Sequence, residues 1–75
     1  MYTIIEIKQQ GSQVRVKTNP PGGAIVSGKL VGHKKSGYVV LFNSNYKVYE
    51  APARLVASVS ASQWSVKKSA YSKYC

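Results

Sequence analysis

Cysteine is almost missing from this chain of 75 residues, and the single cysteine, Cys75, stands at the last position. A disulfide within the chain is therefore excluded, and a zinc site is disfavoured because it needs about four ligands from a chain with one histidine and two acidic residues. We expect no metal and no cofactor. A domain of this size buries only about 60% of the surface of its unfolded chain, so association with other chains is the remaining way to reinforce its core.

Acidic residues are the second shortage. Eleven Lys and Arg stand against Glu6 and Glu50, which gives a formal net charge of +9. A catalytic carboxylate pair would have to be these two residues, His33 has no Cys or Asp near it in sequence, and no glycine-rich phosphate loop is present. We therefore expect no enzymatic activity. The positive charge predicts an anionic partner, with nucleic acid first, and an ordinary solvated basic surface is the alternative.

Long hydrophobic runs are missing as well. No segment approaches the roughly 20 apolar residues needed to span a bilayer. The opening residues, MYTIIEIKQQ, lack the basic start and the cleavage pattern of a signal peptide. We expect a soluble, cytoplasmic protein with no membrane partner.

Short alternating segments dominate what is present. The segment SQVRVKT, residues 12–18, places Val14, Val16 and Thr18 on one side and Arg15 and Lys17 on the other, as in a half-buried strand. Turn-forming residues separate this segment from four more predicted strands, at 24–34, 38–43, 46–50 and 54–60. Residues 51–53 interrupt the strand pattern before the last of these segments. Residues 1–10 fit either a strand or a short helix.

Gly28 lies inside the second predicted strand, where a glycine indicates a sharp bend. Five short strands, one of them kinked, predict an all-β fold: a small, strongly bent, five-stranded antiparallel barrel. We expect a single domain over residues 1–60, followed by a basic tail rich in Tyr, Ser and Lys over 61–75. The tail is predicted to form a short strand or helix around 63–68 and to fray beyond it.

The run YVVLF, residues 38–42, is apolar on both faces of its strand. A small monomer buries one face, and the other requires a cover. A neighbouring copy of the chain is one candidate, because closed assembly removes exposed strand edges. The chain's own ends are the other, since they carry Ile4, Ile5, Ile7 and Trp64.

These segments resemble a known family. The stretch VRVKT…GAIVSGKLVGHKKSGYVVLFN is similar to the first motif of Sm and LSm proteins, and VYEAPARLVASVS is similar to the second motif in its bacterial (Hfq) version. The resemblance covers about residues 13–60 and implies a ring-forming barrel that binds RNA. The stretch GYVVLFNSNYKVYEAPARLV is also similar to the SH3-like DNA-binding domain of retroviral integrases, which implies a monomeric module.

The site expectations follow from charge and from the resemblance. Lys34, Lys35 and Tyr38 form a cationic loop with an aromatic that suits a single strand, although a solvated turn beside a core tyrosine fits equally. The full set of predicted nucleic-acid-binding residues is Arg15, Lys17, Lys29, His33, Lys34, Lys35, Tyr38 and Lys47. The predicted oligomer interface comprises Val39, Leu41, Val48, Tyr49, Leu55 and Val56.

The sequence therefore predicts a non-catalytic, Sm-like protein that binds single-stranded RNA as a homo-oligomeric ring. A monomeric SH3-like module that binds DNA is the first alternative. A protein-interaction or structural subunit with an acidic partner is the second.

Overall fold

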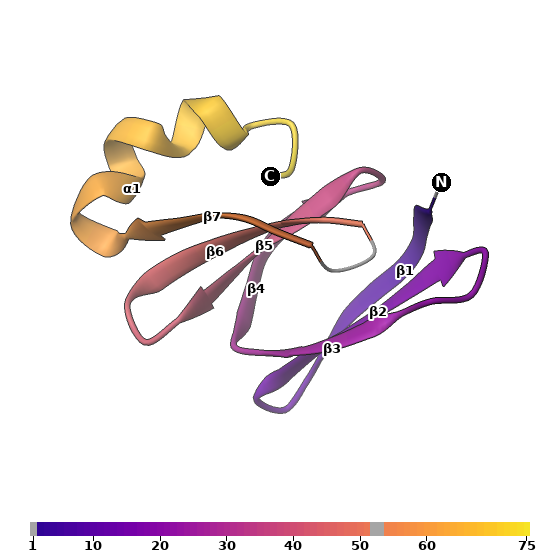
Figure 1. Ribbon diagram of the computed structural model, residues 1–75. Helices are drawn as coiled ribbons and strands as arrows, with labels where there is room; N and C mark the ends of the chain where they lie inside the picture. Colours follow the sequence, from indigo (N-terminus) through magenta and orange to yellow (C-terminus); the bar gives the residue numbers. More distant parts are fainter. Residues whose placement is uncertain (1, 52–53) are drawn as a thin grey trace.

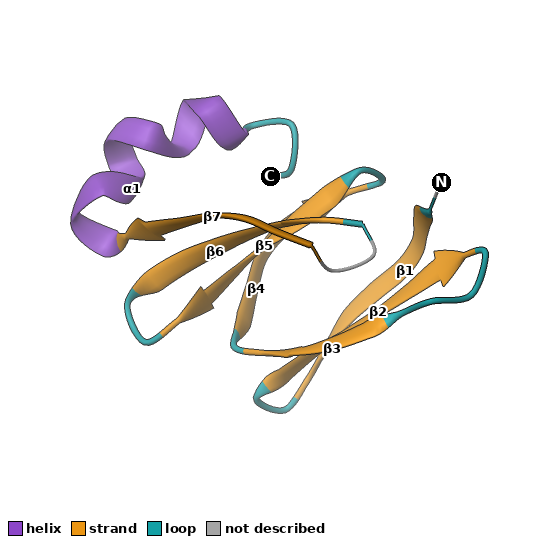
Figure 2. Cartoon of the chain, viewed as in Figure 1, coloured by secondary structure: helices purple, strands orange, loops and turns teal. Residues whose placement is uncertain are grey.

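The computed structural model describes residues 2–51 and 54–75, and these form seven strands in two antiparallel sheets, followed by a short helical segment (Figures 1 and 2). The first sheet has the order β1-β2-β3 and the second the order β4-β5-β6-β7. The elements are β1 Thr3–Gln10, β2 Gln13–Asn19, β3 Ala24–Ser27, β4 Lys29–Lys34, β5 Gly37–Phe42, β6 Asn45–Glu50, β7 Arg54–Ser60, α1 Ala61–Lys67 and the 3₁₀ helix η1 Lys68–Tyr71.

The β-rich class is confirmed, and each predicted strand is present. The segment that periodicity left open at the N-terminus is strand β1, and the predicted strand 24–34 is divided into β3 and β4. Within the described residues the two sheets do not join into a closed barrel. The predicted break at 51–53 falls mainly on positions outside the described residues.

Gly28 makes the division between β3 and β4. Its φ of 132° lies in the region that favours glycine, and a Cβ there would stand 2.5 Å from Cγ1 of Val40 and 2.6 Å from the carbonyl oxygen of Leu41. The chain therefore turns sharply at this residue, and β3 pairs with the first sheet while β4 pairs with the second. This is the bend that the sequence predicts.

The side chain of Gln9 ties the two sheets together at this bend. Its Nε2 donates to the carbonyl oxygen of Gly28 (2.9 Å), and its Oε1 accepts from the backbone N–H of Leu30 (2.7 Å). At the other end of β1, the N–H of Ile4 donates to the carbonyl oxygen of Lys35 (3.2 Å). The position of β1 against β4 is thus set by hydrogen bonds at both ends of the strand.

One hydrophobic core joins residues of the two sheets. Ile4, Ile7, Val14 and Val16 from the first sheet pack with Tyr38, Val40 and Tyr49 from the second. The rings of Tyr38 and Tyr49 are stacked, with centroids 5.0 Å apart. The predicted alternation of buried and exposed residues in β2 is confirmed: Val14, Val16 and Thr18 are buried, while Arg15 and Lys17 are exposed.

A second core lies on the opposite face of the four-stranded sheet. Val39, Val48 and Val59 are buried there beneath Trp64 and Tyr74 of the C-terminal segment, which Figure 1 shows in yellow and orange beside β6 and β7. The Trp64 ring stacks on Tyr46, with centroids 4.3 Å apart. The chain's own tail, through Trp64, therefore covers the second apolar face of the 38–42 run.

Two sequence predictions need correction at this point. The tail does not fray beyond Lys68, because η1 continues the helical segment and Tyr74 is buried. Val39, Val48 and Tyr49 are not available as an interface between chains, because they are buried within this one.

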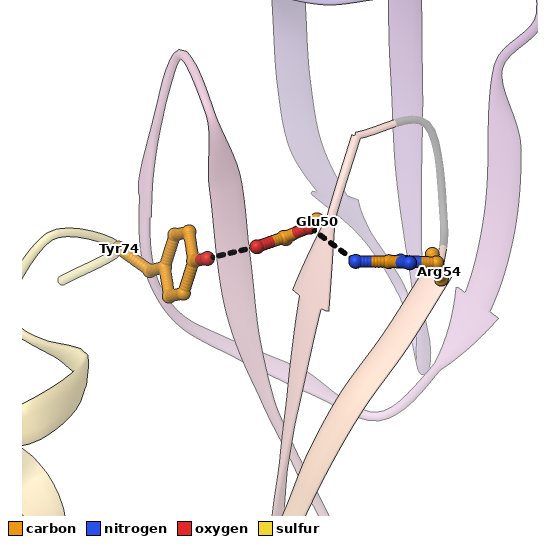
Figure 3. Close-up of polar contacts among 3 residues, drawn as sticks. All are labelled: Glu50, Arg54 and Tyr74. Atoms are coloured by element: carbon orange, nitrogen blue, oxygen red, sulfur yellow. Dashed lines mark hydrogen bonds and ion pairs between the residues drawn. The ribbon is translucent and has the colours of Figure 1, made fainter.

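Polar contacts hold the tail on the sheet (Figure 3). Tyr74 Oη donates to Glu50 Oε1 (2.7 Å), and Arg54 Nη2 donates to Glu50 Oε2 (2.9 Å). The hydrogen bond from Tyr74, and after it that from Arg54, lowers the pKa of Glu50 below its usual range. Lys34 Nζ donates to the carbonyl oxygen of Ser72 (3.2 Å) and adds a contact from β4.

Candidate nucleic-acid interface

The exposed face of the first sheet carries cations from neighbouring strands. Arg15 on β2 lies directly across from Lys8 on β1, and on its other side it pairs with Ile25 on β3. Like charges placed opposite each other in a sheet are destabilising, so this pair costs free energy unless an anion lies over it. Lys17 differs from these two cations in having an acidic partner, because its Nζ lies 4.0 Å from Oε1 of Glu6.

Three hollows follow β3 from this face to the second sheet. The first, of about 480 Å³, is lined by Arg15, Lys17 and Ile25 among others. The second, of about 290 Å³, shares Ile25 with it and adds Ser27, Phe42 and Lys47.

The third hollow, of about 660 Å³, shares Ser27 and Phe42 with the second and adds Lys29. Neighbouring hollows share lining residues along β3, so we treat the three together. We call this surface the β3 track, and its cations are Arg15, Lys17, Lys29 and Lys47.

Phe42 is the exposed aromatic residue of the β3 track. It ends β5, and 37% of its surface is exposed. The ammonium of Lys47 lies 5.0 Å from the centroid of its ring, within the range of a cation–π contact. A base on this ring would stack on its other face, or would displace the ammonium toward the phosphate of the same nucleotide.

Tyr38 does not have the predicted role. Its ring is fully buried between the sheets, so neither face is open to a base. Burial, and after it the neighbouring Tyr49, raises the pKa of Tyr38 well above its usual range. Its hydroxyl has no hydrogen-bond partner in the part of the chain that the structure describes. Tyr38 and Phe42 lie on the same face of β5, and only the far end of that strand is uncovered.

The cluster His33, Lys34 and Lys35 lies away from the β3 track. Lys29 and Lys34 are the two ends of β4, about 17 Å apart at a rise of about 3.3 Å per residue. The cluster lines a hollow of about 270 Å³ beside β1, and Lys34 is engaged with the tail through Ser72. The structure therefore brings together four of the predicted cations and separates these three residues from them.

The carboxylates leave the β3 track strongly positive. Glu50 binds Arg54 and Tyr74 at the tail. Glu6 reaches only Lys17, and both groups of that pair are about half exposed, where ion pairs are worth little. Among residues 2–51 and 54–75, neither carboxylate pairs with Arg15, Lys29 or Lys47.

The remaining predicted interface residues have different environments. Leu41 is half-buried and lines the largest hollow of the β3 track. Leu55 and Val56 on β7 are exposed, at 52% and 38%. β7 is an edge of its sheet, so it is the surviving part of the predicted interface.

Sequence reasoning missed Lys8, Ile25 and Phe42. The signal for Lys8 was available: Gly11 and Ser12 form a tight turn, and counting back from it places Lys8 across from Arg15. No comparable signal existed for Phe42, whose exposure depends on where the first sheet stops covering β5.

No protein-family model, curated protein or solved structure matches this chain. Over the described residues, no helix has both the length and the apolar character required to cross a bilayer.

Proposed function

We propose that this chain is a non-catalytic module that binds single-stranded nucleic acid, RNA in the first place, along the β3 track. The observation that carries the proposal is that three hollows along β3, which share lining residues, combine four cations with the exposed ring of Phe42. Proteins that bind single strands use this combination, with cations along the backbone and an aromatic for stacking. The predicted binding role of His33, Lys34 and Lys35 is not part of this proposal.

The choice of RNA rests on the resemblance of residues 13–60 to Sm-like proteins. The bend at Gly28, which sends one continuous segment from the first sheet into the second, is a feature that this resemblance leads one to expect, and it is the structural support for the proposal. The exposed aromatic favours a single strand over a duplex, because bases in a duplex are already stacked.

The test is fluorescence anisotropy with labelled oligouridine, oligodeoxythymidine and a DNA duplex at several salt concentrations. Phe42→Ala is expected to weaken binding to the single strands by about 1–3 kcal/mol at every salt concentration, since stacking is not screened. Arg15→Gln is expected to reduce the slope of log affinity against log salt by about 0.7, the value for one phosphate contact on a single strand.

Matched controls come from the opposite side of the molecule. Lys67→Gln on α1 removes the same charge as Arg15→Gln, and Val66→Ala removes apolar surface that is 78% exposed. Both are expected to bind as the wild type does. Tighter binding of the duplex would favour the SH3-like alternative. Absence of binding to all three probes at low salt would leave an acidic protein partner as the better proposal.

Self-association is a second candidate function, and the exposed edge of strand β7 favours it. Leu55 and Val56 expose apolar surface beside unpaired backbone groups, a combination that invites pairing with another chain. A ring of about five to seven chains would follow from closed symmetry and the Sm resemblance. Light scattering decides it: a mass of 8.2 kDa at micromolar concentration means a monomer and removes the ring.

A further inference from the structure

The largest hollow of the β3 track has features that the proposed binding of a single strand does not require. Its volume of about 660 Å³ lies within the range of about 300–1,000 Å³ typical of small-molecule sites. Three separate turns of the chain meet there: the Gly11–Ser12 turn, the bend at Gly28 and the start of the β5–β6 turn at Asn43. Phosphate contact along a track needs cations alone, whereas this hollow also presents apolar and hydrogen-bonding residues.

The walls of the hollow combine apolar and polar groups. Leu41 and Phe42 contribute apolar surface, and Lys29 contributes a cation. Over the described part of the chain, no hydrogen bond engages the side chains of Ser12 or Asn43, which leaves a hydroxyl and an amide free at the rim. An aromatic platform, a cation and an unengaged amide are the groups that hold one nucleotide: stacking for the base, charge for the phosphate and hydrogen bonds for the base edge.

The hollow is held open by contacts of its own. The backbone N–H of Gly28 donates to the carbonyl oxygen of Ser12 (2.8 Å), and Gln9 Nε2 donates to the carbonyl oxygens of Gly11 (2.9 Å) and Gln13 (3.1 Å). Both the nitrogen and the oxygen of the Gln9 amide are therefore hydrogen-bonded to the protein, and Gln9 lines the hollow. Because these contacts exist without a ligand, binding would require little reorganisation, and preformed sites bind more tightly for that reason.

We propose that this hollow binds one nucleotide of the strand, with its base against Phe42, its phosphate beside Lys29, and its base edge hydrogen-bonded by Asn43 and Ser12. This inference rests on the proposed function. It adds that the chain discriminates between bases at one position of an otherwise sequence-independent track. The amide of Asn43 supplies both a donor and an acceptor, which is what reading a base edge requires.

The test is an NMR titration of ¹⁵N-labelled protein with each of the 5′-monophosphates UMP, CMP, AMP and GMP. Saturable shifts are expected at the amides of Ser12, Gly28 and Asn43, with one nucleotide binding about tenfold more tightly than the weakest, the discrimination that one good pair of hydrogen bonds provides. Oligonucleotides that differ in one base should show the same preference in anisotropy.

Two variants separate the hollow from the rest of the track. Ser12→Leu fills it without changing charge, and Asn43→Gly removes the amide while suiting a φ of 47°. Ser12→Leu is expected to lose the mononucleotide shifts, and Asn43→Gly the base preference, while both keep the salt slope for oligonucleotides. Ser65→Leu on α1 is the matched control, and thermal melts establish that each variant is folded.

The outcomes distinguish the two proposals. Mononucleotide shifts confined to Arg15 and Lys17, or equal affinity for all four nucleotides, would overturn the nucleotide site while oligonucleotide binding still stands. Retention of base preference in the folded Asn43→Gly variant would also overturn it. Failure of both oligonucleotides and mononucleotides to bind would remove the proposed function and this inference with it.

Discussion

The two sheets of this protein bury their apolar residues in different ways. The three-stranded sheet alternates apolar and polar residues in β2, buries one face and leaves the other to solvent with Lys8, Arg15 and Lys17. The four-stranded sheet buries apolar residues on both faces, and β5 has four consecutive buried residues from Gly37 to Val40. A small domain can therefore hold a strand that is apolar on both faces if its own tail provides the second cover.

The two sheets also differ in how some of their charged side chains are arranged. In the covered sheet, Glu50 neutralises Arg54 and accepts from Tyr74, so the polar groups at the tail satisfy one another. On the bare sheet, Lys8 and Arg15 face each other across the strands. These two cations lie on the exposed face of the first sheet, and there we place the ligand.

The largest expected effect comes from removing the cover. Trp64→Ala deletes the ring that stacks on Tyr46 and closes the second core. We expect a loss of about 3–5 kcal/mol in the free energy of unfolding, the range for truncating a buried tryptophan. Chemical denaturation followed by circular dichroism measures it.

Val66→Ala on the same helix is the control, because Val66 is exposed and its truncation should change stability by less than about 0.5 kcal/mol. Equal losses in the two variants would mean that the tail does not cover the sheet in solution. The comparison of the two sheets would then break down.

A smaller effect is expected at the joint between the sheets. Gly28→Ala introduces a Cβ at 2.5–2.6 Å from Val40 and Leu41, at a φ that suits glycine. We expect a loss of about 1–3 kcal/mol from strain and overpacking, measured by denaturation. Gly11→Ala is the matched control, since φ is also positive there but a Cβ meets nothing within 4 Å. A loss no larger at Gly28 than at Gly11 would show that the close packing at the bend is not needed.

The smallest effect has the opposite sign. Tyr38→Phe removes a buried hydroxyl that has no partner among the described residues, so we expect a gain of about 1 kcal/mol at neutral pH. Burial raises the pKa of Tyr38, so the neutral form is favoured in the folded state. As pH rises above the ordinary tyrosine pKa of about 10, the unfolded chain releases the Tyr38 proton while the folded chain keeps it. The free energy of unfolding therefore falls with rising pH in this range.

Thermal melts from pH 7 to pH 11 test this prediction. The Tyr38→Phe variant should lose less stability than the wild type between pH 10 and pH 11. Tyr2→Phe serves as a control at neutral pH, since its hydroxyl belongs to an exposed residue and its removal should bring no gain. A loss of stability at neutral pH in Tyr38→Phe would mean that the hydroxyl has a partner in solution, such as a buried water.

Most strands of this protein could be predicted from the sequence, because alternation along a strand and the residues that form turns act over a few neighbours; residues 1–10 stayed open between strand and helix. Val14, Val16 and Arg15 lie on the faces that period-two alternation predicts, and Gly28 bends the chain as a glycine in a strand indicates. The location of the positive charge on β2 followed from the same pattern.

Only the tertiary structure decided which of these residues are uncovered. Tyr38 and Phe42 share one face of β5, yet the first sheet covers Tyr38 and stops before Phe42, so the aromatic available to a ligand is the second one. Val39 and Val48 were predicted to form an interface with a neighbouring chain, but they are buried beneath Trp64 and Tyr74 of the chain's own tail. Local patterns specify the face on which a side chain lies, whereas burial depends on where a distant segment ends, and no local pattern carries that information.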